Sequence, residues 1–350
     1  FATIVAGIVL NEEKGLHGLI IATIIAGIIL VLMGVCKLGS LIKFIPYTIT
    51  TGFTAGIAVT IFIGQIKDFL GLQYADGVKP IETIEKIEAN IHAIGTFSWQ
   101  ALLVGAVSLA ILIIYPKIEK RIPPSLIAVV VGALMVKYIP GLDDGVFTIG
   151  ELYTIPSGFP KFALSGMEIS FETIKAVLPD AFTIAILAAI ESLLSCVVAD
   201  GMVNSKHNSN SELVAQGVGN IASVLFGGIP ATGAIARTAA NVKNGGRTPV
   251  AGMVHALVLL LVLMFLMPLA GLIPMPTIAA ILFMVAFNMS EYKEFVHIVK
   301  TAPKTDVFVM AITFALTVIF DLVVAIAVGM VFVALFYMTG KLLKKNSKTE

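Results

Sequence analysis

The chain has 350 residues, of which 58% are hydrophobic and only 13% are charged, and its formal net charge is +1. Soluble domains carry about 25% charged residues, so this composition excludes an ordinary soluble domain and indicates an all-α polytopic membrane protein. The near-neutral charge also argues against a nucleic-acid-binding protein, whose basic patches would be conspicuous. Two cysteines, Cys36 and Cys196, lie in apolar stretches without framework spacing, which predicts buried, inert thiols rather than a disulfide.

Apolar runs of about the length that crosses a bilayer recur along the whole chain. A spanning helix needs about 20 apolar residues, and several runs here are shorter or interrupted, as is typical of transporters near a midplane binding site. In chain order, the expected segments are 1–10 (a short piece), 16–35, 45–66, 99–115, 124–136, 178–199, 213–226, an interrupted stretch, 250–267, 277–289, 307–320 and 322–337.

Lysine and arginine residues in the connections predict the orientation of these segments. When the basic tail 341–350 is placed in the cytoplasm, most of the basic residues in the short connections fall on the same side, as the positive-inside rule requires. The loops 68–98 and 140–177 then lie outside, together with Asp321. The charged stretch 291–304 is predicted to be an amphipathic interfacial helix on the cytoplasmic side.

A polar stretch begins at Asp200, which we expect at a solvated helix end or bonded to the following loop. His207 is predicted to be a loop residue, and Asn210 or Ser211 is expected to cap the next helix. The other four histidines, His17, His92, His255 and His297, share no metal-ligand spacing, so no metal site is expected. No cofactor is expected either.

The residues from Phe226 to Val250 interrupt the apolar pattern. They read FGGIPATGAIARTAANVKNGGRTPV, with Gly and Pro breaks and one arginine, Arg237, among small side chains. Gly and Pro leave peptide groups without helical partners, and such backbone is tolerated at membrane depth only where it is buried in protein or lines a cavity. We therefore predict an extended piece over about 229–234, followed by a short helix whose first turn holds Arg237.

The positive end of that short helix, with its unpaired N–H groups, would form an anion site. Arg237 can clamp an anion with its forked donors, or it can instead tie the segment to Glu191 or to carbonyl groups. Thr232 and Thr238 can offer hydroxyls to a ligand or bond their own helix backbone. The predicted substrate-binding residues are Ala231, Thr232, Gly233, Ala234, Ile235, Ala236 and Arg237.

Glu191 is the clearest ionisable residue inside a predicted spanning segment, where such groups are rare and commonly functional. Ser195 follows one turn later on the same helix face, and small neighbouring residues would let a partner helix or a substrate approach. The carboxyl group can take and release a proton or hold a cation. Alternatively, it is a structural carboxylate paired with Arg237 or with a backbone group. Glu191 and Ser195 are the predicted coupling residues.

Two stretches place a proline before a run of small and β-branched residues, FIPYTITTGFTAGIAV from Phe44 and LIPMPTIAAILFMVAFNM from Leu272. Such an echo between two halves of a chain is the pattern expected of an internal repeat.

The residues around these candidates resemble a known family. IESLLSCVVADGM, followed by KHNSNSELVAQGVGNIASVLFGGIPATGAIARTAANVKNGGRTPVAG, is similar to the sulfate permease (SulP) family of anion transporters. Weaker similarity runs from CKLGSLIKFIPYTITTGFTAGIA to the end of the predicted membrane part. By position, Glu191 matches the family's membrane carboxylate, Arg237 the basic residue beside the anion site, and 231–236 an extended strand.

The resemblance implies a fold of fourteen segments in two inverted repeats of seven, which uracil permeases share and of which this chain would hold a part. A core domain, with short strands at its broken segments, would move against a gate domain. The first two segments and the start of the third would precede Phe1, and a cytoplasmic STAS domain would follow the chain. The implied divisions are core 1–36, gate 37–140, extracellular linker 141–177, core 178–268, gate 269–340 and a linker 341–350.

The activity implied by the resemblance is secondary active transport of a small anion, sulfate or a dicarboxylate, by alternating access. The protein would be a homodimer in the lipid bilayer of the inner (plasma) membrane. Relatives similar to sodium-coupled bicarbonate transporters tend to have a small residue in place of Arg237 and an aspartate near Glu191, so this chain favours coupling to a proton, or exchange. Sodium-coupled bicarbonate transport, nucleobase permeation and an anion channel remain alternatives. An enzyme is disfavoured, because Ser195 and Glu191 have no nearby histidine.

Overall fold

The computed structural model describes residues 2–11, 14–40, 46–119, 122–154, 158–163, 170–320 and 322–338. Predictions for Phe1, Asp321, the tail 341–350 and part of the first echo stretch therefore lie outside the described residues. Within the described part, six helices are long and apolar enough to cross a membrane: Gly15–Val35, Tyr47–Leu70, Trp99–Ile118, Phe171–Val203, Val250–Ala270 and Met275–Thr301.

The chain folds into two compact units, each built from two separated stretches of sequence. Unit 1 contains Phe1–Pro46 and Phe159–Leu257, and unit 2 contains Tyr47–Gly158 and Val258–Glu350. The assignment of core and gate roles to particular residue ranges stays a prediction.

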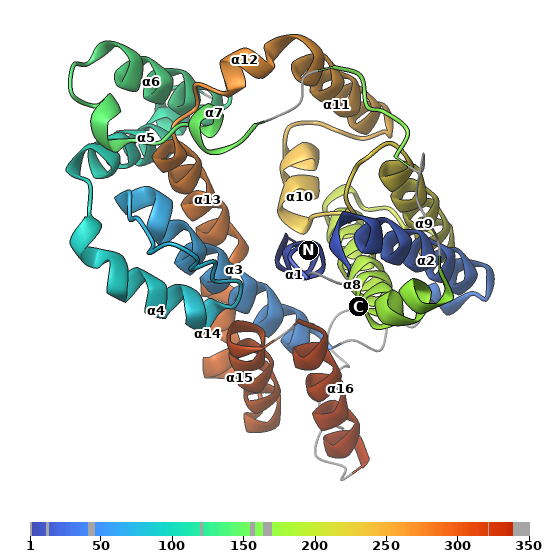
Figure 1. Ribbon diagram of the computed structural model, residues 1–350. Coiled ribbons are helices and arrows are strands. Elements are labelled where there is room, and N and C mark those ends of the chain that lie inside the picture. Colours follow the sequence, from blue (N-terminus) through green and yellow to red (C-terminus); the bar gives the residue numbers. More distant parts are fainter. Residues whose placement is uncertain are drawn as a thin grey trace. The chain divides into compact units, whose positions relative to one another are not determined.

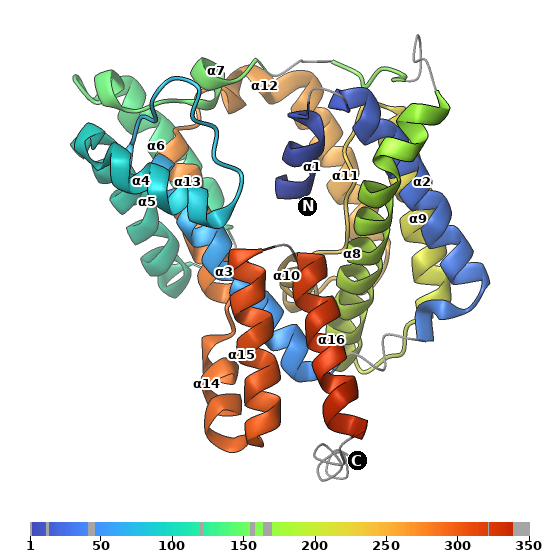
Figure 2. The same ribbon diagram turned by 60° about the horizontal axis from the view of Figure 1, so that its bottom comes forward.

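Unit 1 is a helical bundle around α8, the longest helix described. Its elements are α1 (Ala2–Val9), α2 (Gly15–Val35), α8 (Phe171–Val203), α9 (Ser209–Leu225), α10 (Ile235–Lys243) and the first part of α11 (Val250–Leu261). Helices α2, α8 and α9 lie side by side in both views (Figures 1 and 2). The core between them is made of small and branched apolar side chains, including Leu19, Ala22, Leu30, Ile184 and Leu213.

Helices α2 and α9 approach each other at glycines. A Cβ atom added to Gly27 of α2 would lie 2.7 Å from the carbonyl oxygen of Gly217 in α9. Near the end of α2, a Cβ on Gly34 would lie 2.6 Å from the carbonyl oxygen of Asn210. Only glycine leaves room for backbones at this separation, so the glycines of both helices set how closely α9 packs in unit 1.

The N-terminus of α9 differs from the prediction. Asn208 is the cap: its side chain accepts hydrogen bonds from the backbone N–H groups of Asn210 and Ser211, both at 3.1 Å. Asn210 and Ser211 were therefore wrong as capping residues. The Asn210 side chain instead accepts a bond of 3.0 Å from the backbone N–H of Gly39, which connects the end of α2 to the start of α9.

Unit 2 is organised around α3 (Tyr47–Leu70), which packs against α13 (Met275–Met289) and α15 (Lys304–Ile319). The buried hydroxyls of Ser108 and Thr277 lie 2.9 Å apart where α5 (Trp99–Ile118) meets α13. The remaining elements are α4 (Thr83–Ala93), η2 (Ile94–Thr96), α6 (Pro124–Tyr138), η3 (Asp143–Gly145), α7 (Ile149–Leu152), the π-helix η4 (Val262–Leu266), α12 (Met267–Ala270), α14 (Tyr292–Thr301) and α16 (Leu322–Met338).

The charged stretch 291–304 and the two cysteines were also the subject of predictions. The predicted helix over 291–304 is present as α14, with Ile298 as its buried residue; its place at a membrane surface stays a prediction. Both cysteines are free, but Cys36 is exposed and Cys196 is half-buried, so the prediction of buried thiols was wrong for Cys36. Cys36 is the residue that follows the last turn of α2.

Candidate functional site

The predicted break is present in unit 1. After α9, the chain turns at Gly227, whose φ of +75° suits glycine, and residues 228–234 form no helix. Helix α10 then begins at Ile235, with Ala234 as an N-cap residue in extended conformation that makes no side-chain capping bond. The first N–H groups of α10 consequently lack a cap from the preceding residue. Within the described residues, the segment belongs to no named strand.

Helix α9 holds one edge of the extended segment. The Asn220 side chain accepts a hydrogen bond of 2.7 Å from the backbone N–H of Ala231 and donates one of 2.9 Å to its carbonyl oxygen. Gln216 also donates to that carbonyl oxygen, and the hydroxyl of Ser223 donates to the carbonyl oxygen of Ile229 at 3.1 Å. Sequence reasoning missed these residues. The available signal was their spacing, because 216, 220 and 223 lie on one face of a helix otherwise predicted to be apolar.

Helix α8 contacts the other side of the segment. The Thr232 hydroxyl donates to the carbonyl oxygen of Ala188 at 3.3 Å. A Cβ atom added to Gly233 would lie 3.4 Å from Ser192 Oγ and 3.7 Å from Ser195 Cβ, so the segment lies directly against α8. The Ser195 hydroxyl, which is buried, donates to Thr238 Oγ1 at 2.8 Å and so ties α8 to α10.

Arg237 lies in the first turn of α10, as predicted, and is exposed. In the part of the chain that the structure describes, the ion pairs are Lys14–Asp180 and His207–Asp200, and Arg237 belongs to neither. The alternative in which Arg237 is neutralised by Glu191 is therefore not realised there. A positively charged residue in the first turn of a helix whose N–H groups have no side-chain cap adds to the attraction of that N-terminus for anions. The side chain of Ala236, another predicted site residue, is not among those that the structure describes.

Glu191 lies midway along α8 and is half-buried. Among the described residues, no hydrogen bond or ion pair involves its carboxyl group. The next residue, Ser192, is buried and donates to the carboxylate of Glu212 in α9. Glu191 and Ser195 are thus not bonded to each other, although both belong to the helix that contacts the segment.

Two other polar contacts in unit 1 have structural explanations. Asp200 accepts bonds from the backbone N–H of His207 at 2.9 Å and pairs with its Nδ1 at 2.7 Å, in agreement with the expected bond to the loop. Lys14, at the start of α2, pairs with Asp180 of α8 at 2.7 Å, and both side chains are 22% exposed. The second pair was not foreseen from the sequence.

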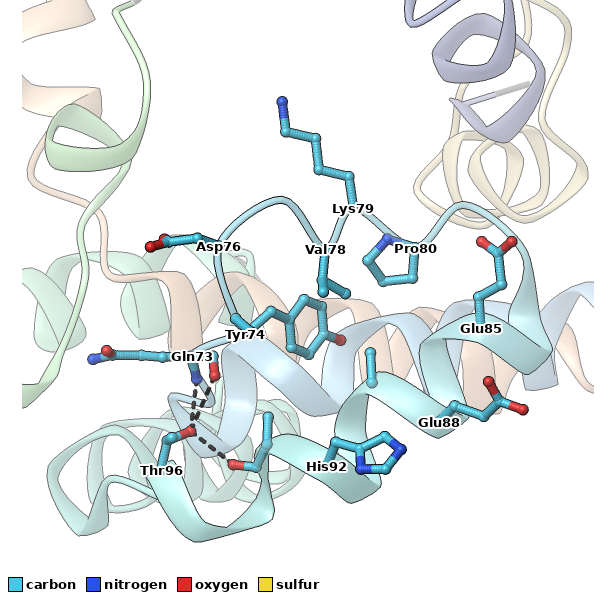
Figure 3. A pocket seen from close by; sticks show the side chains of 13 residues that line it. Gln73, Tyr74, Asp76, Val78, Lys79, Pro80, Glu85, Glu88, His92 and Thr96 are labelled. Atoms are coloured by element: carbon cyan, nitrogen blue, oxygen red, sulfur yellow. Dashed lines mark hydrogen bonds between the residues drawn. The ribbon is translucent and has the colours of Figure 1, made fainter.

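A cavity of about 900 Å³ lies elsewhere, in unit 2 between the loop after α3 and helix α4 (Figure 3). Backbone N–H groups of Ile81 and Glu82 hold the pKa of Glu85 below its usual value, and burial raises the pKa of Tyr74. The cavity is an open groove that contains none of the predicted site residues, so the candidate site remains the break. Its lining is Gln73, Tyr74, Ala75, Asp76, Val78, Lys79, Pro80, Glu85, Glu88, Ala89, His92, Ala93 and Thr96.

Comparison with known proteins identifies the family. The model of the sulfate permease family matches residues 1–313. The chain belongs to the sulfate permease family. It is 43% identical over 343 residues to YvdB of Bacillus subtilis (strain 168), whose name proposes sulfate transport. It is also 35% identical over 329 residues to the bicarbonate transporter BicA of Picosynechococcus sp. (strain ATCC 27264 / PCC 7002 / PR-6).

A solved structure shares the fold of this sulfate permease chain. The transmembrane domain of a cyanobacterial bicarbonate transporter, BicA, superposes with a TM-score of 0.76 at 29% identity, over 94% of this chain and 80% of that one. The chain therefore has the all-α, inverted-repeat fold of a multi-pass membrane transporter. The matches cover 96% and 93% of this chain, but they extend over only 62% of YvdB and 56% of BicA.

Proposed function

We propose that this chain belongs to a secondary active transporter of small anions, sulfate or a dicarboxylate, that works by alternating access. The anion would bind at the break, where the first turn of α10 has N–H groups without a side-chain cap and also holds Arg237. The single observation that carries this proposal is that Arg237 is exposed and outside the described ion pairs, beside a helix N-terminus without a side-chain cap.

The physical basis is charge complementarity at a fixed position. A helix N-terminus carries roughly half a positive charge, and hydrogen bonds to charged groups contribute about 1.5–3 kcal/mol each. The residues from Ala231 to Ala234 are small, so an anion can approach the peptide groups closely. Binding at the break, rather than in the groove of unit 2, is favoured because that groove carries the carboxylates of Asp76, Glu85 and Glu88.

Coupling is proposed to use Glu191, with Ser195 as its neighbour on α8. Protonation of Glu191 removes a negative charge from the helix that contacts the segment, and this would favour entry of an anion. We further propose that the protein is a proton symporter rather than an enzyme, lies in the plasma membrane and works as a homodimer.

The anion site is tested by equilibrium binding of radiolabelled sulfate to the purified protein in detergent. Arg237→Ala should weaken binding by about 10–100-fold, because it removes a charge-assisted contact of about 1.5–3 kcal/mol. Lys243→Ala is the matched control, because it removes a positive charge from the opposite end of the same helix. Equal affinities for wild type and Arg237→Ala would exclude the clamp.

The coupling role is tested by sulfate uptake into proteoliposomes with and without an inward proton gradient. Glu191→Gln should abolish the stimulation by the gradient while leaving downhill exchange measurable. Uptake that remains equally stimulated in the variant would remove Glu191 from the coupling mechanism.

A second candidate, sodium-coupled bicarbonate transport, is favoured by the similarity to BicA in sequence and structure. Uptake that requires sodium and is competed by bicarbonate but not by sulfate would select it. Competition by uracil would instead indicate a nucleobase permease, and currents without accumulation against a gradient would indicate a channel.

A further inference from the structure

The buried amide of Asn220 makes an unusual set of contacts with the break. Its side chain is 3% exposed and lies on the face of α9 that also carries Gln216 and Ser223. A buried amide is costly unless its donors and acceptor are all bonded. Besides the two bonds to Ala231, the amide nitrogen donates to the carbonyl oxygen of Gln216 at 3.1 Å, so both its polar atoms are used.

The pattern of these bonds resembles the pairing between β-strands. In an antiparallel pair, one residue exchanges an N–H···O bond and an O···H–N bond with the residue opposite. Asn220 makes both bonds to Ala231 with a single amide group, at 2.7 Å and 2.9 Å. A helix side chain therefore performs the role of a neighbouring strand and fixes the register of the extended segment at one residue.

The segment is held more weakly toward α8 than toward α9, where Gln216 also donates to the carbonyl oxygen of Ala231 and Ser223 to that of Ile229. Toward α8, Thr232 makes one hydrogen bond of 3.3 Å, and Gly233 has only van der Waals contacts. Ala231 is three residues before Ala234, the N-cap of α10. A rotation of the segment at Ala231 would thus be carried into the first turn of α10, where the N–H groups and Arg237 lie.

We propose that Asn220 is a positioning residue for anion binding: by clamping both backbone polar groups of Ala231, it orients the peptide donors at the start of α10. The proposal rests on the proposed function for the identity of the ligand. A purely structural role would not change the affinity for the anion, whereas a positioning role predicts that substitutions of Asn220 weaken anion binding. The loss should depend on pH in Asn220→Asp but not in Asn220→Leu.

The critical variant is Asn220→Asp. Its carboxylate can still accept from the N–H of Ala231, but the second oxygen would face two carbonyl oxygens at the positions where the amide now donates over 2.9 Å and 3.1 Å. Protonation of the carboxyl group restores one donor. Asn220→Leu, of similar volume, cannot make either bond at any pH.

The measurement is the dissociation constant of radiolabelled sulfate, given as the ratio of variant to wild type at pH 5.5 and at pH 8. The ratio removes any pH dependence that the two proteins share. For Asn220→Asp we expect about tenfold weaker binding at pH 8, equivalent to about 1.4 kcal/mol, and recovery of most of the loss at pH 5.5. Asn220→Leu should be weakened at both values. Asn90→Asp, a buried amide on α4, is the matched control and should show a ratio near one.

Hydrogen exchange of the peptide covering 228–235 provides a readout that needs no ligand. The backbone amides there should exchange faster in Asn220→Leu than in wild type. Unchanged exchange would overturn the clamp, and faster exchange with unchanged sulfate affinity would reduce Asn220 to a structural residue. If wild-type protein binds no sulfate, the proposed function fails instead, while the exchange result still decides whether Asn220 holds the segment.

Discussion

Substituting Gly217 should separate helix α9 from α2. A Cβ atom at this position would lie 2.5 Å from the carbonyl oxygen of Gly27 and 2.9 Å from Val31 Cγ2, about 1 Å closer than ordinary contacts of about 3.5–4.0 Å. The nearest obstacle is backbone, which cannot rotate away, so the helices must move. Inserting a methyl group into such a contact costs about 1–3 kcal/mol.

Gly219→Ala is an internal control, because a Cβ there has no atom within 4 Å. Both variants replace glycine inside the same helix, so they gain the same helix propensity of about 1 kcal/mol, and their difference isolates the packing term. Thermal unfolding in detergent should place Gly217→Ala below Gly219→Ala, by about 2–4 °C for each kcal/mol. Equal melting temperatures for the two variants would refute the close packing of α2 and α9.

Three further changes have defined outcomes. Lys14→Met should lower the free energy of unfolding by about 1–2 kcal/mol, less than the 3–5 kcal/mol for breaking a fully buried pair, because both partners are 22% exposed. Adding Asp180→Leu to this variant should recover part of the loss in melting temperature, and additive losses from the two substitutions would argue against the pair. Gly233→Ala should keep the melting temperature because its Cβ would have contacts of 3.4 Å or more, whereas Gly233→Leu should lower it; equal effects would contradict the contact with α8. Because the pKa of Glu85 is lowered, its carboxylate stabilises the start of α4 at pH values above the usual pKa of 4.5, and this stabilisation is lost as the pH falls through the lowered pKa. Hydrogen exchange of residues 81–85 should therefore accelerate in acid in the wild type but not in Glu85→Gln, and identical pH profiles of exchange would exclude the capping role.

The break was predictable from the sequence because its cause is local. Glycine and proline residues on either side of Ile229 cannot continue a spanning helix, whatever surrounds them, so an extended piece followed by a short helix could be placed within a few residues. The position of Arg237 in the first turn of α10 follows from the same reasoning. The family resemblance added the fold, which composition alone could not give.

The contacts of the site were less predictable because they join distant residues. Asn220 bonds to Ala231 only because the chain turns back at Gly227, and Lys14 meets Asp180 across 166 residues of sequence. The cap of α9 was misplaced for the opposite reason. Several Asn and Ser residues follow one another there, each could cap a helix, and packing against Gly39 engages Asn210 and leaves Asn208 to cap.

The central claim is that the break binds an anion. Diffraction from crystals of the protein soaked in selenate, a sulfate analogue with an anomalous signal, tests it most directly. The account predicts an anomalous peak within hydrogen-bond distance of the first backbone N–H groups of α10 and close to Arg237. A peak only at another place, or a first turn of α10 closed by protein groups with no peak beside it, would contradict the account.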